Sequence, residues 1–318
     1  MARKEREIPK VKTLSLFDLQ RMFPDEQSAI DYLAGILWKN GVVCPYCEGK
    51  NVKERKKRKN FYHCNDCNKD FTIRVGTIFH RSHIPLHKWL CAMCLLVQAR
   101  AGISSLELSK WLDISQVSAW FLLHRIREAC GNQVHKFLYG IVEADVAHLG
   151  GKEKNKHFKK RLRKGRGAVG KTHVHGMRDR KGQVVLQIVA DEDAPTLQGI
   201  IKENVLVGST VCTDEAPAYN GLAAAHFNHQ TVNHSAGQYV KNGIYHTNSI
   251  ESVWAVIKRG HYGVYHQMSP QHRFRYIHEF AYRLNEGNVK FDTVDRLESL
   301  IRGAMGRRLT WKMLVQGI

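Results

Sequence analysis

Three carboxylate residues that are distant in the sequence are candidates for a shared metal site. Asp145 follows the apolar run 138–142, Asp214 follows the run 209–213, and Glu251 lies in a segment with helical periodicity. Short apolar runs are typical of strands, so we expect both aspartates where strands end. Carboxylate oxygens are the ligands that hard cations such as Mg²⁺ prefer. Two such cations can activate the attacking oxygen and stabilise the leaving oxygen in phosphodiester displacement.

Residues 246–259 predict the helix that would position Glu251. One apolar stripe recurs with the helical period: Ile250, Val253, Trp254 and Ile257. Lys258 lies two turns beyond Glu251, roughly 10 Å along the same flank. Asn248, three residues before Glu251, could also face the metals. A third carboxylate offsets the charge of two divalent ions and an amide does not. We therefore predict Glu251 as the ligand and Asn248 as a supporting residue or a helix cap.

Four cysteines have the spacing of a structural zinc site. They form two Cys-x-x-Cys pairs separated by sixteen residues: Cys44, Cys47, Cys64 and Cys67. Two disulfides are the alternative, but they require an oxidising compartment that nothing in the sequence indicates, so we predict one zinc ion. A further pair, Cys91 and Cys94, lies in the apolar segment 89–97 and is interpreted as two buried thiols.

The charge balance indicates a polyanionic partner. The chain has 318 residues, with 49 Lys and Arg against 29 Asp and Glu, a formal net charge of +20. Nucleic acid is the favoured partner. A membrane surface is the alternative, but the first residues lack the apolar core of a signal peptide, and the longest apolar helix, 89–101, is too short to span a bilayer. We therefore expect a soluble cytoplasmic protein associated with the nucleoid, with no membrane partner.

Two basic stretches are predicted to contact DNA phosphates. One lies between the cysteine pairs and includes Lys56 and Lys57, with a solvated loop as the alternative. The other has nine Lys and Arg between positions 152 and 166 against the single acid Glu153, so it cannot pack into a core. Close to a metal site, it is expected to clamp a DNA backbone. Its candidates are Lys159, Lys160, Arg161 and Arg163.

The N-terminal part of the chain predicts two domains. Residues 1–80 would hold a helix followed by the cysteine motif. In residues 81–135, a short helix at 106–112, a brief turn and a longer helix at 116–129 predict a helix-turn-helix. The second helix would enter the major groove of DNA, and a plain helical hairpin is the alternative. The polar side of that helix offers Gln116 and Arg125.

The rest of the chain predicts an α/β domain at residues 136–290 and a helical tail at 291–318. Two segments of alternating polarity flank a turn at 179–182 and indicate a hairpin. A helix at 195–203 and the strand that delivers Asp214 follow. The order of these elements is strand, hairpin, helix, strand and helix.

Three sequence blocks surround the acids. Residues 142–151 read Val-Glu-Ala-Asp-Val-Ala-His-Leu-Gly-Gly, residues 211–222 read Val-Cys-Thr-Asp-Glu-Ala-Pro-Ala-Tyr-Asn-Gly-Leu, and residues 246–254 read His-Thr-Asn-Ser-Ile-Glu-Ser-Val-Trp. These blocks resemble those of DDE-type insertion-sequence transposases that carry an N-terminal zinc ribbon, the group of insertion sequence 1595. The resemblance covers nearly the whole chain.

The resemblance implies an RNase H-like catalytic domain, a mixed sheet with flanking helices, whose order of elements the sequence matches. It implies that Asp145, Asp214 and Glu251 hold two Mg²⁺ or Mn²⁺ ions, and that Lys258 is the basic residue that follows them. A downstream segment resembles the next helix of the family and supplies two accessory residues, Glu279 and Arg283. Two positions differ from the family pattern: Val146 stands where an acid is expected, and Glu286 where an Arg is common.

We therefore expect a multidomain α+β protein that combines a zinc ribbon, a helix-turn-helix and an RNase H-like domain. The function implied by the resemblance is that of a transposase. It would bind the ends of its element as a homo-oligomer, cleave phosphodiesters and join the 3′-hydroxyl to target DNA. Two alternatives stay open: a DNA-binding regulator that has lost catalysis, which Val146 and Glu286 would favour, and a metal-dependent nuclease without strand transfer.

Overall fold

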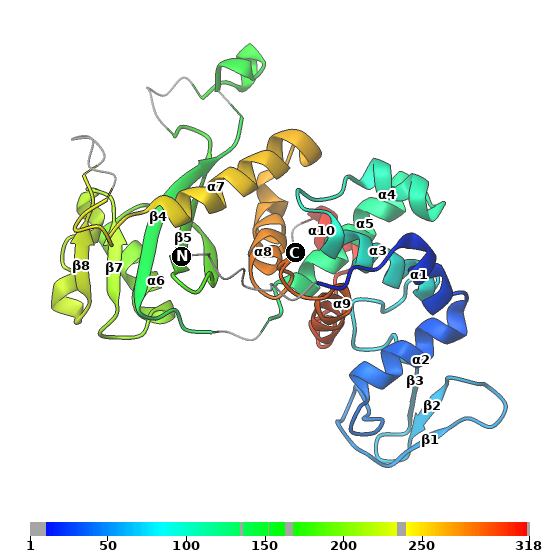
Figure 1. Cartoon of the computed structure of the whole chain (residues 1–318). Helices are drawn as coiled ribbons and strands as arrows, with labels where there is room; N and C mark the ends of the chain where they lie inside the picture. The colour runs from blue at the N-terminus through cyan, green and yellow to red at the C-terminus, as the bar shows by residue number, and fades with distance from the viewer. Residues whose placement is uncertain (1–10, 134–135, 152, 163–167, 234–239, 317–318) are drawn as a thin grey trace, which may run out of the picture. The chain divides into compact units, whose positions relative to one another are not determined.

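The computed structural model describes residues 11–133, 136–151, 153–162, 168–233 and 240–316. The chain divides into two compact units (Figure 1). Unit 1 combines residues 1–133 with 286–318, and unit 2 spans residues 134–285. The C-terminal segment therefore belongs to the same unit as the N-terminal one. No helix in the described ranges is long and apolar enough to cross a membrane.

Unit 1 begins with two helices, α1 (Leu16–Met22) and α2 (Glu26–Leu37). Asp25 caps α2 by accepting a hydrogen bond from a backbone N–H of its first turn, at 2.8 Å. Helix α1 was not predicted, although the sequence contains its start signal. Ser15 and Asp18 form a reciprocal capping box, the Ser-x-x-acid pattern that satisfies two free N–H groups at once.

The cysteine motif folds into a small antiparallel sheet, β1 (Val52–Glu54), β2 (Tyr62–Cys64) and β3 (Lys69–Phe71), in that order. Three strands of three residues cannot bury a core by themselves. Trp38, just after α2, is one of the apolar residues that pack against the ribbon core. Its ring lies 5.0 Å from the ring of Tyr62, edge to face, and also contacts the last residue of β3.

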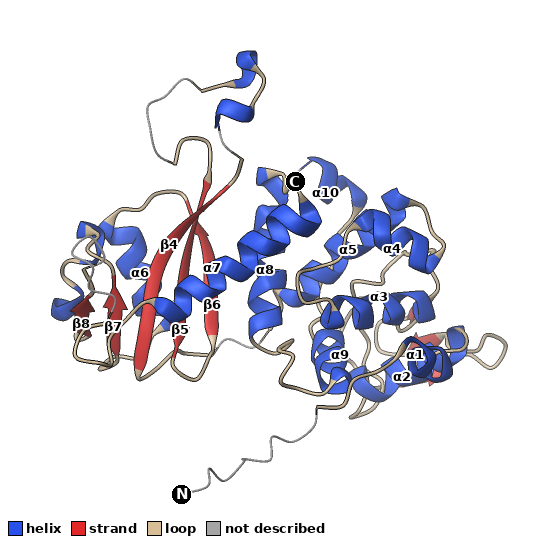
Figure 2. Ribbon diagram, turned by 45° about the horizontal axis from the view of Figure 1, so that its top comes forward, coloured by secondary structure: helices blue, strands red, loops and turns tan. Residues whose placement is uncertain are grey.

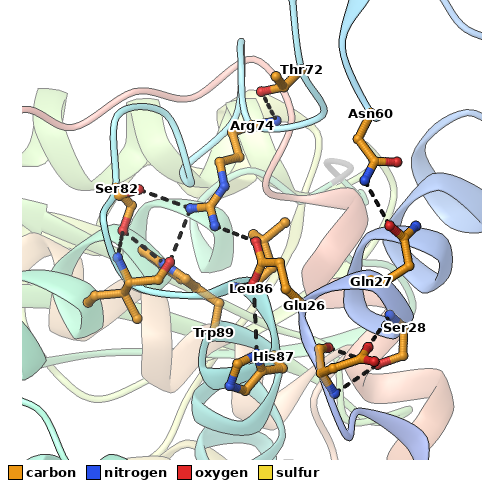
Figure 3. A network of polar contacts seen from close by, with 12 residues as sticks. Glu26, Gln27, Ser28, Asn60, Thr72, Arg74, Ser82, Leu86, His87 and Trp89 are labelled. Atoms are coloured by element: carbon orange, nitrogen blue, oxygen red, sulfur yellow. Dashed lines mark hydrogen bonds and ion pairs between the residues drawn. The ribbon is translucent and has the colours of Figure 1, made fainter. Parts of the chain in front are cut away.

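A polar network links α2 to the segment that follows the ribbon (Figure 3). Arg74 pairs with Glu26 at 2.6 Å and donates to the carbonyl oxygens of Ser82 at 3.0 Å and Ile84 at 3.1 Å. The second oxygen of Glu26 accepts the backbone N–H of Leu86, at the start of the next helix. The pair is partly buried, and its two side chains also hydrogen bond the backbone groups of Ser82, Ile84 and Leu86. It therefore stabilises unit 1 more than an exposed ion pair would.

The remainder of unit 1 is helical. It contains α3 (Leu86–Gln98), α4 (Ser105–Leu112), α5 (Gln116–Cys130), α9 (Thr293–Arg302) and α10 (Trp311–Gln316). Ser104 and Ser115 cap α4 and α5 through the N–H three residues on, at 3.1 and 3.2 Å. Asp113 closes the turn between these two helices in the left-handed conformation, at φ 48°. The predicted short helix, brief turn and longer helix are all present.

Unit 2 is built on a five-stranded mixed sheet. Its strands are β4 (Ile141–Leu149), β5 (Thr172–Asp179), β6 (Val184–Val189), β7 (Thr210–Thr213) and β8 (Asn228–Thr231). The order is β6-β5-β4-β7-β8, with antiparallel pairing within β4, β5 and β6 and parallel pairing of β7 with β4 and β8. This is the predicted RNase H-like arrangement. The prediction that Asp145 lies at a strand end is wrong, because β4 continues four residues beyond it.

Helices cover both faces of this sheet. Helix α6 (Ala194–Asn204) packs in a core with Val142 and Ala144, and α7 (Asn248–Gly260) and α8 (Arg273–Leu284) pack in a core with Ala147. Alternate residues of β4 therefore point to opposite cores. Figures 1 and 2 show α7 running across β4 and β5. Short turns complete the unit: η1 (Glu153–Asn155), η2 (Phe158–Lys160), η3 (Pro217–Tyr219), η4 (Leu222–Ala225), the π-helical η5 (His261–Tyr265) and η6 (Pro270–His272).

Candidate active site and zinc site

Asp145 lies in the middle of β4, partly buried, with a hydrogen-bond donor on each oxygen. Oδ1 accepts the backbone N–H of Val146 at 2.8 Å, and Oδ2 accepts the indole Nε1–H of Trp254 at 2.8 Å. Trp254 was predicted only as part of the apolar stripe of α7. A buried Trp needs a hydrogen-bond acceptor for its single N–H, and here Asp145 supplies it. The same hydrogen bond holds the carboxylate toward α7.

A glycine makes room for this contact. Gly176 on β5 is the register partner of Asp145 on β4. A Cβ at this position would lie 2.4 Å from the ring of Trp254. Any side chain at this position would therefore displace the indole from the carboxylate. The glycine lets α7 approach the sheet closely enough for Trp254 to reach Asp145.

The structure brings Asp145 into electrostatic reach of the other two predicted carboxylates, Asp214 and Glu251. Burial raises the pKa of Asp145 against the effect of its two hydrogen bonds, and the charges of Asp214 and Glu251 raise it further. Asp214 directly follows β7, as predicted, and accepts the N–H of Ala216 at 3.1 Å. These three described side chains do not bring one oxygen each within 4.8 Å of the others. A bound cation would relieve the repulsion between these carboxylates.

The raised pKa of Asp145 predicts how stability depends on pH without divalent cations. The folded state holds the Asp145 proton to higher pH than the unfolded state. As pH rises from the ordinary pKa of an aspartate to the raised pKa of Asp145, the folded protein must give up this proton at a cost. The free energy of unfolding therefore falls over that pH range. Asn has no carboxyl group to ionise but loses one of the two acceptors, so Asp145→Asn is expected to gain stability relative to the wild type as pH rises from mild acid to neutral, whatever its constant offset. Urea unfolding of both proteins at the two pH values measures this, and a difference between them that does not change with pH would contradict it.

A fourth acid, Glu143, fixes the start of α7. The helix has no side-chain cap of its own, since its first flanking residue, Thr247, makes no capping hydrogen bond. Glu143 supplies the acceptor from β4, because its Oε2 accepts the N–H of Ile250 at 2.9 Å. Its Oε1 pairs with Arg180 and lies 3.3 Å from Nδ1 of His246, and the side chain is only 1% exposed. A carboxylate at a helix N-terminus is also favoured by the helix dipole.

Two arginines of the β5–β6 hairpin complete this anchoring. Arg178 donates to the carbonyl of Ser249 at 3.0 Å and to the hydroxyl of Ser252 at 2.8 Å. Arg180 donates to the carbonyl of Ile244 at 2.9 Å. The sequence predicted the hairpin turn correctly but gave no sign of this role. The first turn of α7, which carries Glu251, is held by side chains from β4 and the hairpin.

The other residues predicted for this site lie around it. Asn248 and Lys258 are exposed on α7. Asn248 is the first residue of the helix, so the capping role considered for it falls to Glu143 instead. Val146, where the family pattern has an acid, packs against the α6 core on the opposite face of the sheet from Asp145. The substitution at 146 therefore does not alter the face that carries Asp145.

Glu279 and Arg283, predicted as accessory residues, form a buried ion pair on α8. Nη2 and Nε of Arg283 donate to the same oxygen of Glu279 at 2.6 and 3.0 Å. The hydroxyl of Tyr265, in the π-helical turn after α7, donates to that oxygen at 2.5 Å. The pair therefore ties α8 to the end of α7.

The four cysteines of the ribbon converge as predicted, with one sulfur each within 4.8 Å of the others. Two Sγ–Sγ distances, Cys44 to Cys67 and Cys47 to Cys64, are 3.6 Å. Tetrahedral zinc with Zn–S bonds of about 2.3 Å requires sulfurs about 3.8 Å apart, so the set fits zinc. Burial opposes ionisation of Cys44, but backbone N–H groups, among them that of Tyr46 at 3.4 Å, lower its pKa to about 7.

One of the predicted DNA contacts is wrong. Arg125 on α5 is only 3% exposed. It donates to the carbonyl of His80, and its guanidinium lies over the rings of Trp89 at 5.5 Å and Phe121 at 5.2 Å. Neighbouring side chains cover this part of α5, so Arg125 packs inside unit 1. Gln116, at the start of the same helix, is exposed.

The remaining basic candidates are accessible where the structure describes them. Lys56 and Lys57 are exposed on the loop between β1 and β2, and Lys159 and Arg161 are exposed on the segment between β4 and β5. The side chain of Lys160 and all of Arg163 lie outside the described residues. The acid of this segment, Glu153, pairs with Lys156 at 2.6 Å and accepts the N–H of Leu162 at 2.8 Å, so it organises the segment.

Both units match transposase families. Residues 137–285 match the ISXO2-like transposase domain, and residues 24–70 match the transposase zinc-ribbon domain. A protein of the transposable element ISH50 from Halobacterium salinarum is 30% identical over 253 residues, which cover 75% of this chain and 84% of that protein. A transposase-like protein of Haemophilus influenzae is 30% identical over 125 residues, 39% of this chain and 98% of that protein.

Two solved structures show a weaker likeness. The catalytic core domain of HTLV-2 integrase in complex with magnesium has a TM-score of 0.29 and 16% identity, covering 49% of this chain and 90% of that chain. The Mos1 transposase paired-end complex with the left transposon end has a TM-score of 0.28 and 13% identity. The match covers 68% of this chain and 74% of that chain. At these scores the likeness is too weak to support a functional conclusion.

Proposed function

Because the chain belongs to the IS1595 family of insertion-sequence transposases, we propose that it cuts DNA at the ends of its element and joins the freed 3′-hydroxyl to target DNA. The observation that carries the proposal is the convergence of Asp145, Asp214 and Glu251, each on a separate element of unit 2. The net charge of +20 supports a DNA substrate in the nucleoid. We expect a homo-oligomer, because two element ends must be handled together.

The three carboxylates would hold two Mg²⁺ or Mn²⁺ ions, which when bound activate the attacking oxygen and stabilise the leaving one. The protein's part is to fix the ligands before substrate arrives. Trp254 and the N–H of Val146 hold both oxygens of Asp145, and Glu143 holds the helix turn that carries Glu251. Lys258, further along α7, would contact a phosphate of the bound DNA.

A nicking and joining assay tests this function. Labelled DNA carrying an element end is incubated with the protein and Mg²⁺ or Mn²⁺, next to a binding measurement on the same preparation. Cleavage followed by strand transfer is the expected result. Binding without cleavage under either metal would support the regulator, and cleavage without joining would support the simple nuclease.

The basic segment between β4 and β5 is expected to bind the DNA backbone. Changing Lys159, Lys160, Arg161 and Arg163 to Gln together should weaken binding and reduce its salt dependence, by up to about 0.9 logarithmic units of slope per lost phosphate contact. Binding constants measured over a range of salt concentrations give the slope. The control is Lys202→Gln, an exposed lysine on α6, which should leave the slope unchanged. An unchanged slope in the fourfold variant would show that the segment is only solvated.

Zinc is expected to be required for the ribbon. Cys64→Ser removes one of four thiolates, so the protein should lose its tightly bound zinc and its specific binding to end DNA, while unit 2 stays folded. Elemental analysis and DNA binding measure the two effects. Cys91→Ser is the matched control, because it changes a Cys-x-x-Cys cysteine on α3 that lies outside the converging set. Purified wild type without zinc would contradict the prediction.

A further inference from the structure

A third cluster of metal-ligand side chains lies in unit 2, apart from the two sites above. His148 on β4 and His173 on β5 are register partners in the antiparallel pair. Glu192, between β6 and α6, reaches both of them. Its Oε1 lies 2.5 Å from Nε2 of His148 and also hydrogen bonds Nδ1 of His173. Three separate chain segments therefore direct a nitrogen or oxygen atom to one point.

The three side chains are close enough to share a single ion, which would have to open the 2.5 Å between Oε1 of Glu192 and Nε2 of His148 to the about 3.3 Å that ligands of tetrahedral zinc keep. One ligand atom from each side chain lies within 4.8 Å of the other two. The imidazole rings are nearly perpendicular, at 89° with centroids 5.0 Å apart, so they converge and do not stack. The side chains of His148, His173 and Glu192 are 36%, 27% and 36% exposed, so water can supply the remaining ligands.

We propose that His148, His173 and Glu192 bind one divalent transition-metal ion of the zinc class. Two imidazole nitrogens and one carboxylate oxygen, with an open position, form a ligand set that zinc accepts, and nitrogen donors favour such ions over Mg²⁺. With neutral imidazoles the set carries one negative charge, which complements a cation. The backbone register positions both histidines before any metal arrives, so little entropy is lost on binding.

This site is distinct from the carboxylate site. His148 lies three residues beyond Asp145 on β4, and side chains three apart on a strand point to opposite faces. A bound ion would join the end of β4, the start of β5 and the residues before α6. Because His148 precedes and His173 follows the basic segment 152–166, the ion would bind the chain on both sides of that segment. The proposal does not depend on the catalytic function.

Cobalt titration of the full-length protein tests the site. Cobalt held by the four cysteines gives thiolate charge-transfer absorption, which two histidines and a carboxylate cannot give. With excess Mg²⁺ present to occupy the carboxylate site, the wild type is expected to bind a further equivalent of Co²⁺ that adds visible absorption without more charge transfer. His148→Ala, His173→Ala and Glu192→Gln should each lose that equivalent and keep the thiolate signal. His157→Ala, an exposed histidine outside the cluster, should keep both.

One further variant and one result on the wild type decide the assignment. Asp214→Asn should keep the additional equivalent, and its loss there would place the ion among the catalytic acids and overturn the proposal. A wild type that binds cobalt only through thiolates would show that the cluster is a hydrogen-bonded group without metal. Unchanged urea unfolding of the three cluster variants in the absence of metal shows that they are folded. If one of the three unfolds, the other two still decide the case, because each removes a different ligand of the same ion.

Discussion

Glu251→Gln is expected to lower cleavage and strand transfer by several orders of magnitude while binding of end DNA stays nearly intact. Gln keeps the shape of the side chain but loses the charge that two divalent ions require. Asp145→Asn and Asp214→Asn should have the same effect for the same reason. In Asp145→Asn the amide oxygen can still accept the Trp254 hydrogen bond, but the amide NH2 replaces the oxygen that accepts the Val146 N–H, so retained binding of end DNA must show that this variant is folded. Nicking and joining of labelled end DNA, beside a binding measurement, gives both quantities.

Asn248→Ala is the matched control for the third ligand. Asn248 lies at the exposed start of α7, one turn before Glu251, and the helix start is held by Glu143. Its loss should therefore reduce activity much less than the loss of Glu251. An inactive Asn248→Ala beside an active Glu251→Gln would reverse the assignment. A wild type that binds ends and never cuts them would show that the carboxylates no longer serve catalysis.

The sequence was sufficient where a feature depends on neighbouring residues. Helix caps at Asp25, Ser104 and Ser115 and the two cysteine knuckles follow from patterns within a few residues. The end of β4 was misplaced because the apolar run stops at residue 142. Beyond residue 142, successive residues of β4 face two separate cores on the two sides of the sheet. The strand therefore continues without an unbroken apolar run.

Features that depend on pairing between distant segments could not be predicted in this way. His148 and His173 are 25 residues apart, and only the register of β4 with β5 places them opposite each other. Arg125 has the charge of a DNA contact, but packing of the helices around α5 encloses it. Glu143 was part of a recognised sequence block, yet its role requires knowing that α7 begins above β4.

Glu143→Ala is expected to destabilise unit 2 by about 3 kcal/mol, because removing one partner of a buried ion pair leaves the other uncompensated. Arg180 is 29% exposed, which limits the penalty on that side. The same change removes the acceptor for the Ile250 N–H, so the first turn of α7 loses its anchor and Glu251 its fixed position. Activity should fall even at temperatures where the variant remains folded. Urea unfolding and the cleavage assay measure the two effects.

Glu143→Gln separates the two contributions of this residue. Gln can still accept the Ile250 N–H but cannot pair with Arg180, so its stability should lie between that of Glu143→Ala and the wild type. The matched control is Glu203→Ala, an exposed acid on α6, which should change stability by less than about 0.5 kcal/mol. If Glu143→Ala were as stable as Glu203→Ala, the buried carboxylate would not hold α7. If it were stable but inactive, Glu143 would act on the site without supporting the fold.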